Sequence, residues 1–102
     1  MTLHVVLFHR LARREYQTAL RWYAQRSPQA ALRFKDEVAR AVQRIAGNPD
    51  HGPVYQGVYR WARTGRFPYL LYYRRVGPDH LLVTAVAHSR RQPGYWLRRK
   101  YP

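Results

Sequence analysis

The chain has 102 residues, which suits a single domain spanning residues 1–102, and its hydrophobic content of 46% excludes an intrinsically disordered protein. The absence of cysteine excludes disulfides and thiolate metal sites. Nineteen lysines and arginines against five acids give a net charge of +14, so the surface attracts polyanions, either nucleic acid or an acidic protein.

Seventeen of the nineteen cations are arginines, which favours planar bidentate contacts or stacking over the point charge of lysine. No apolar stretch approaches the roughly 18 residues of a membrane span, and the N-terminus lacks the pattern of a signal peptide. We therefore expect a cytoplasmic protein with no membrane contact.

Residues 3–8 are a short, apolar and β-branched run, which predicts a first strand. From Leu11 to Arg26 the apolar side chains recur at helical spacing. Ser27 and Pro28 then end one helix and begin the next, because serine caps a helix and proline at the first position loses no hydrogen bond. The second helix is predicted to run to about Ala46, where Gly47-Asn48-Pro49 stops it.

Residues 50–57 are rich in turn formers and predict a surface loop. Strands are expected at residues 58–63, 69–76 and 81–87, joined by short glycine-containing links typical of antiparallel hairpins. The order β-α-α-β-β-β predicts an α+β fold, with a helical hairpin packed on one face of a small, mostly antiparallel sheet. Because neighbours along a strand point in opposite directions, Tyr72 and Tyr73 should lie one under the helices and one on an exposed face.

The last predicted strand leads directly into a cluster of cations and rings, made of His88, Arg90, Arg91, Tyr95 and Trp96. Guanidinium groups bind phosphate or carboxylate, and aromatic faces stack on bases or fill a pocket of a partner. Alternatively, Tyr95 and Trp96 close the core while the arginines are solvated. Both interpretations stay open from the sequence alone.

This order of elements, together with its residues, resembles the ParE/RelE family of bacterial type II toxins over essentially the whole chain. The strongest joint signal is the Phe67-Pro68-Tyr69 strand start followed by the pattern from His88 to Trp96. Further matching pieces are Trp22-Tyr23, Phe34, Asn48-Pro49 with Gly52-Pro53, and Ala85-Val86-Ala87. The chain looks closer to the ParE side of the family, whose members are also known as plasmid-stabilisation proteins.

The resemblance implies a single RelE/ParE-like toxin domain that is held inactive by a cognate antitoxin with an acidic or amphipathic segment. ParE-type members inhibit DNA gyrase through a non-enzymatic interaction. RelE-type members are endoribonucleases that cleave messenger RNA on the ribosome without a metal. The shared fold does not decide between these activities, and neither requires a cofactor.

Metal-free RNA cleavage needs a base, a proton donor and cations that stabilise the phosphorane. If the chain is such an RNase, Arg90 and Tyr95 match the C-terminal arginine and tyrosine of the family. His88 is then the only plausible local base, and Arg60 could stabilise charge. The chain departs from the RelE pattern at Leu70, where an arginine is expected, and in the preceding strand, where Arg60 and Ala62 replace lysines. Since an arginine stays protonated and is a poor general base, Arg60 cannot easily replace a lysine in proton transfer, and we expect binding in preference to catalysis.

Neither the histidines nor the five acids have the spacing of a metal site, so no metal is expected. The same cations and rings also suit an interface for the target or partner. The predicted interface residues are Arg60, Trp61, Arg63, Arg66, Arg90, Arg91, Tyr95 and Trp96. Three hypotheses remain: a ParE-like gyrase inhibitor, a RelE-like mRNA endoribonuclease, and a non-toxic basic nucleic-acid-binding domain.

Overall fold

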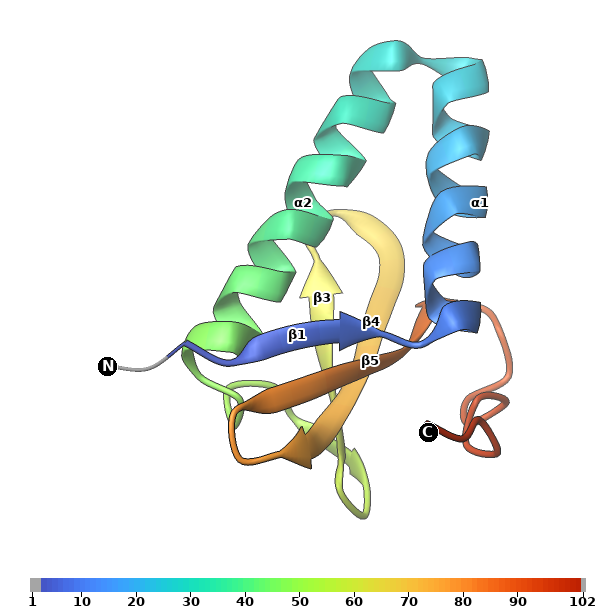
Figure 1. Ribbon diagram of the computed structural model, residues 1–102. Coiled ribbons are helices and arrows are strands. Elements are labelled where there is room, and N and C mark those ends of the chain that lie inside the picture. Colours follow the sequence, from blue (N-terminus) through green and yellow to red (C-terminus); the bar gives the residue numbers. More distant parts are fainter. Residues whose placement is uncertain (1–2, 102) are drawn as a thin grey trace.

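The computed structural model describes residues 3–101, which form two helices and five strands (Figure 1). In chain order these are β1 (Val5–Phe8), α1 (Arg10–Arg26), α2 (Pro28–Gly47), β2 (Val54–Gln56), β3 (Tyr59–Thr64), β4 (Phe67–Gly77) and β5 (His80–His88). The two helices form an antiparallel hairpin over one face of the sheet, as Figure 1 shows. The predicted α+β architecture is confirmed.

The sheet has the strand order β1-β5-β4-β3-β2. The three later pairs are antiparallel, whereas β1 runs parallel to β5 in a register that places Val5 opposite His80. The first strand therefore lies at one edge of the sheet, next to the last strand. The mostly antiparallel sheet is confirmed, and the structure adds that its one parallel pair joins β1 to β5.

The two helices begin and end where their capping residues predict. Ser27 follows α1 and caps α2, its hydroxyl oxygen accepting a 3.2 Å hydrogen bond from the backbone N–H of Ala30. His9 caps α1 in the same way, because its Nδ1 accepts from the N–H of Leu11 at 3.0 Å. We predicted that this helix starts at Leu11, and the histidine cap moves the start to Arg10.

The helix-facing side of the sheet holds the main core. Ala12 of α1 and Ile45 of α2 pack on Leu71, Tyr73 and Val83 of the sheet, all of them fully or almost fully buried. The Tyr73 hydroxyl donates a 2.7 Å hydrogen bond to the carbonyl of Pro49, so the same ring also holds the loop after α2. A second cluster centred on the buried Phe34 joins the upper parts of the two helices to the start of β4.

The opposite face of the sheet is also covered, which agrees with the alternative interpretation in which Trp96 closes the core. Residues 89–101 turn back under the sheet and place Trp96, which is fully buried, on the ring of Tyr72 with 4.5 Å between centroids. Tyr59 and Tyr55 complete this second core around Trp96. Tyr72 and Tyr73 do point to opposite faces, but the expectation that one of them is exposed is wrong, because the C-terminal segment buries Tyr72.

Smaller differences concern the boundaries of elements. The first strand begins at Val5 instead of residue 3, and the segment predicted as a loop contains the short strand β2. Gly52 in this loop is buried, and a Cβ there would collide with the carbonyl oxygen of Trp61. Within residues 3–101, no helix is long and apolar enough to cross a membrane.

Candidate functional site

One acid, Glu15 of α1, organises the residues that follow β5. Its carboxylate accepts two hydrogen bonds of 2.9 Å from the guanidinium of Arg99 and one from the Tyr95 hydroxyl. The backbone N–H of Val86 donates to the same carboxylate at 3.0 Å, and Arg91 approaches it at 3.4 Å. The side chains of Glu15 and Arg99 are only 15% and 12% exposed, so this is a largely desolvated ion pair.

The pKa values of this cluster follow from its geometry. Burial alone would raise the pKa of Glu15, but the hydrogen bonds from Arg99, Tyr95 and Val86 outweigh it and lower the pKa below its ordinary value of 4.5. Burial and the hydrogen bond to Glu15 raise the pKa of the Tyr95 hydroxyl well above its usual range. The carboxylate is therefore held ionised, and the phenol is held protonated as its donor.

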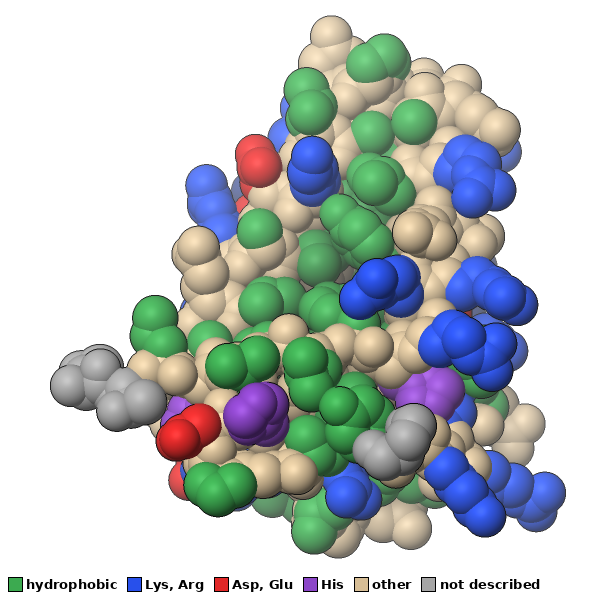
Figure 2. All heavy atoms as spheres, in the orientation of Figure 1, with side chains coloured by type: hydrophobic (Ala, Val, Ile, Leu, Met, Phe, Trp, Pro, Cys, Tyr) green, Lys and Arg blue, Asp and Glu red, His purple; other side chains and the backbone are tan. Residues whose placement is uncertain are grey.

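A groove lies beside this cluster, between α1, the start of β4 and the end of β5. We call it the α1 groove, and its volume is about 380 Å³. Its lining residues include Arg14, Tyr69, His88 and Arg91. The floor is largely apolar, with Leu11, Ala19 and Val86 contributing to it. In Figure 2 the cations gather over α1 and the C-terminal segment, beside a band of hydrophobic side chains between the helices. An apolar floor with a cationic rim suits an amphipathic acidic segment.

His88 lies at the end of β5, and its ring has a structural partner. Its Nδ1 accepts a 3.0 Å hydrogen bond from the backbone N–H of Arg90, and the ring meets that of Tyr69 edge to face at 5.1 Å. This arrangement shapes the turn after the strand. The ring of His88 thus has the structural role that a histidine at a strand end commonly has. The side chain of Arg90 itself is exposed.

Arg60 lies apart from the C-terminal cluster. Its guanidinium donates to the carbonyl of Gly52 at 2.7 Å and to that of Asp50 at 3.3 Å, so it holds the loop after α2. It shares the face of β3 with Ala62, which is buried in the main core. The structure does not bring Arg60 together with His88, Arg90 and Tyr95.

The remaining predicted residues occupy three further places. Trp61 lies on the opposite face of β3 from Arg60, and the guanidinium of Arg63 lies 5.5 Å from its ring centroid. Arg66 is exposed in the β3–β4 turn beside α2, where Glu37 and Arg40 line the same hollow. Trp96 is in the core, so its placement at an interface does not fit the structure. Of the predicted set, only Arg91 and Tyr95 share one cluster with Glu15.

Glu15 is the residue that the sequence reasoning missed. It was counted among five scattered acids, but it falls at helical spacing between Ala12 and Ala19, on the stripe that faces the sheet. An acid on the buried stripe of an arginine-rich chain predicts a buried ion pair. Among residues 3–101, no group of three or more histidine, aspartate or glutamate side chains is arranged to hold a metal.

The arrangement of a helical hairpin on a five-stranded sheet defines a known class of fold. The structure matches one chain described as a chromosomal ParDE toxin–antitoxin system from P. aeruginosa, with a TM-score of 0.70, 16% sequence identity, and coverage of 84% of this chain and 96% of that chain. The model of the family described as ParE toxin of type II toxin–antitoxin system, parDE, matches residues 6–93. This chain belongs to that ParE toxin family. No curated protein sequence matches it.

Proposed function

We propose that this ParE toxin acts by binding DNA gyrase and blocking it, and that a cognate antitoxin neutralises it by covering the α1 groove with an acidic or amphipathic segment. Membership of the ParE family supports the first part. The apolar floor and cationic rim of the groove support the second, because an amphipathic segment with acids would satisfy both. A gyrase-binding protein of this kind would act in the cytoplasm.

The hydrogen bond and the raised pKa of the Tyr95 hydroxyl favour binding over RNA cleavage. A general acid must release its proton, whereas the Tyr95 hydroxyl is committed to Glu15 and its pKa is raised by burial and by that carboxylate. Leu70 occupies the position where the RelE-type resemblance expects an arginine, and it packs against the Trp96 cluster. The guanidinium of Arg60 already donates a hydrogen bond to a carbonyl of the loop after α2. These contacts favour a stable binding surface.

A supercoiling assay tests the proposal. The purified chain is added to gyrase, relaxed plasmid and ATP, and in parallel to a translating extract with a defined messenger RNA. We expect supercoiling to be blocked while the transcript stays intact, and we expect the product of the adjacent reading frame to restore supercoiling. Codon-linked cuts in the transcript with normal supercoiling would overturn the proposal and favour a ribosome-dependent endoribonuclease.

A further inference from the structure

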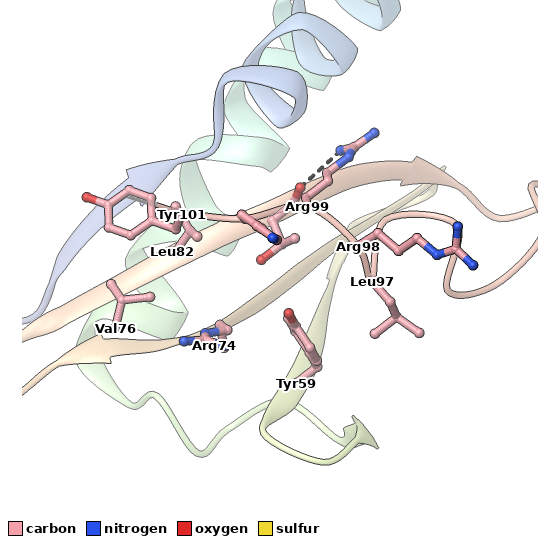
Figure 3. A pocket seen from close by; sticks show the side chains of 10 residues that line it. Tyr59, Arg74, Val76, Leu82, Leu97, Arg98, Arg99 and Tyr101 are labelled. Carbon is pink, nitrogen blue, oxygen red and sulfur yellow. Dashed lines mark hydrogen bonds between the residues drawn. The ribbon is translucent and has the colours of Figure 1, made fainter.

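A second concave site lies on the far face of the sheet and shares Arg99 with the lining of the α1 groove. Its volume is about 790 Å³, and its walls come from β3, β4, β5 and the last residues of the C-terminal segment (Figure 3). The residues that line it are Tyr59, Arg74, Val76, Leu82, Thr84, Leu97, Arg98, Arg99, Lys100 and Tyr101. We call it the far-face pocket. Nothing in the proposed function uses it.

The charge of the far-face pocket is uniformly positive. Four of its lining residues are cations and none is an acid. Arg99 is neutralised by Glu15 and donates a further 3.0 Å hydrogen bond to the carbonyl of Thr84, shown as the dashed line in Figure 3. Figure 3 also shows the Arg98 side chain directed away from the other side chains. Arg74 and Lys100 therefore remain as cations that a ligand in the pocket can meet.

Two polar atoms in the wall of this pocket lack partners. Thr84 is 1% exposed, and its hydroxyl forms no hydrogen bond with any residue that the structure describes. The Nε of Arg74 is likewise buried without a partner among residues 3–101. Buried donors normally have hydrogen-bond partners, because an unpaired donor loses its hydration without compensation. A hydroxyl and a guanidinium N–H that lack partners at one cationic pocket are suited to an oxyanion.

Aromatic side chains form two other parts of the wall. In Figure 3, Tyr101 and Tyr59 lie on opposite sides of the pocket, with Leu82 and Arg74 between them. Tyr101 is 44% exposed, whereas the ring of Tyr59 packs on that of Trp96 with 4.6 Å between centroids. An exposed ring, a packed ring and apolar side chains provide a stacking surface for a planar group.

We infer that the far-face pocket binds the terminal phosphate of a nucleoside phosphate, with Arg74, Lys100 and the Thr84 hydroxyl on the phosphate and the base held between the tyrosine rings. Phosphate chemistry fits because the guanidinium offers several donors to one oxyanion and the buried hydroxyl adds another. The volume lies within the range of about 300–1,000 Å³ that small-ligand sites occupy. None of the residues assigned to the ligand lines the α1 groove, so the inference does not depend on the proposed contact with the antitoxin.

The inference is tested by titrating the full chain with adenosine 5′-monophosphate, adenosine and inorganic phosphate, and by measuring binding by calorimetry. A salt concentration of about 0.15 M screens the nonspecific attraction between the basic protein and any anion. We expect the nucleotide to bind more tightly than either fragment. Arg74→Gln should weaken it by about tenfold, whereas Arg13→Gln, which removes an equal charge from the exposed side of α1, should change it less than about twofold. Equal losses for both variants would overturn the inference.

Two buried threonines give a matched pair. The hydroxyl of Thr64 donates to the carbonyl of Tyr69 at 2.8 Å, whereas that of Thr84 lacks a partner among residues 3–101. Thr64→Val should lower the melting temperature and leave nucleotide affinity unchanged. Thr84→Val should keep or raise the melting temperature and weaken nucleotide binding by at least about threefold. Unchanged affinity in Thr84→Val would overturn the role of the hydroxyl and with it the site.

The phosphate can come from a free nucleotide or from the end of a nucleic-acid chain. A 5′-phosphorylated oligonucleotide distinguishes these two sources. Affinity similar to that of the mononucleotide supports recognition of a chain end, and weaker affinity supports a free nucleotide. Affinity that rises steeply with oligonucleotide length and is insensitive to Arg74→Gln would show binding of the phosphate backbone by the whole basic surface, and would overturn the inference.

Discussion

Glu15 and Arg99 lie 84 positions apart in the sequence and are joined by two hydrogen bonds of 2.9 Å. Through this pair the first helix holds the segment that covers the far face of the sheet. Tyr95 and Arg91 bind the same carboxylate, so one acid fixes three residues of that segment. The C-terminal segment is therefore part of the folded domain and is held both by Glu15 and by the buried ring of Trp96.

Glu15→Gln should destabilise the domain substantially. The substitution leaves the Arg99 guanidinium, which is 12% exposed, without its counter-charge, and breaking a largely buried pair costs about 2–4 kcal/mol. Urea denaturation monitored by circular dichroism measures the change. Glu37→Gln is the control, because Glu37 pairs with Arg40 at 3.8 Å in a more exposed ion pair, and the substitution should cost less than about 0.5 kcal/mol. Similar losses in both variants would contradict the role of Glu15.

The contribution of Glu15 should depend on pH in a defined direction. Because the folded protein lowers its pKa, the carboxylate stabilises the fold above the ordinary pKa of 4.5 and loses this contribution as pH falls through the lowered pKa. The difference in melting temperature between wild type and Glu15→Gln should therefore be constant near neutral pH and should shrink below about pH 4.5. A difference that stays constant down to pH 3 would contradict this assignment.

Tyr95→Phe should retain toxicity while losing some stability. The ring still packs under Arg91, whose guanidinium lies 3.7 Å from its centroid, but the hydrogen bond to Glu15 is lost at a cost of about 1–2 kcal/mol. Growth inhibition after induced expression, together with melting of the purified chain, separates the two effects. A loss of activity of about a hundredfold with an unchanged melting temperature would instead place the hydroxyl in catalysis.

Trp96→Ala should cost more than any other single substitution of an aromatic residue on the far face. Removing this fully buried ring leaves a large cavity against Tyr72, Tyr59 and Tyr55, and comparable truncations cost about 3–5 kcal/mol. Trp22→Ala, at a residue that is 48% exposed, should change stability little and serves as the control. Chemical denaturation of both variants tests the difference. Equal stability would mean that the C-terminal segment does not cover the sheet in solution.

The double variant Arg90→Ala/Arg91→Ala should weaken gyrase inhibition by about tenfold with only a small loss of stability. Arg90 is exposed, and Arg91 contributes a 3.4 Å contact to Glu15 and stacking on Tyr95. The charge-matched control is Arg10→Ala/Arg13→Ala on the exposed side of α1. If both double variants lose the same inhibition, net charge and not the C-terminal arginines drives binding to the target.

Local patterns were sufficient to predict the two helices, their junction at Ser27 and the β3–β4 and β4–β5 hairpins. These features depend on residues close together in sequence, such as the serine cap and the glycine-containing turns. The short strand β2 was missed because its three residues are too few to show alternation.

The candidate site was harder to predict because its contacts span the chain. Nothing near Trp96 indicates whether its ring turns inward, since its burial depends on tyrosines of β2, β3 and β4. The arginines look like one cluster in the sequence, but Arg60 is separated from the others because alternate residues of β3 face opposite sides of the sheet. The role of Glu15 could not be predicted without knowing which later residues reach α1.

The parallel pairing of β1 with β5 has a consequence for synthesis. Residues 5–8 have no partner until residues 80–83 have left the ribosome, because Val5 pairs with His80 and Phe8 with Val83. Contacts of such high sequence separation form late and slow folding. A nascent chain thus carries an unpaired apolar strand until β5 has been made.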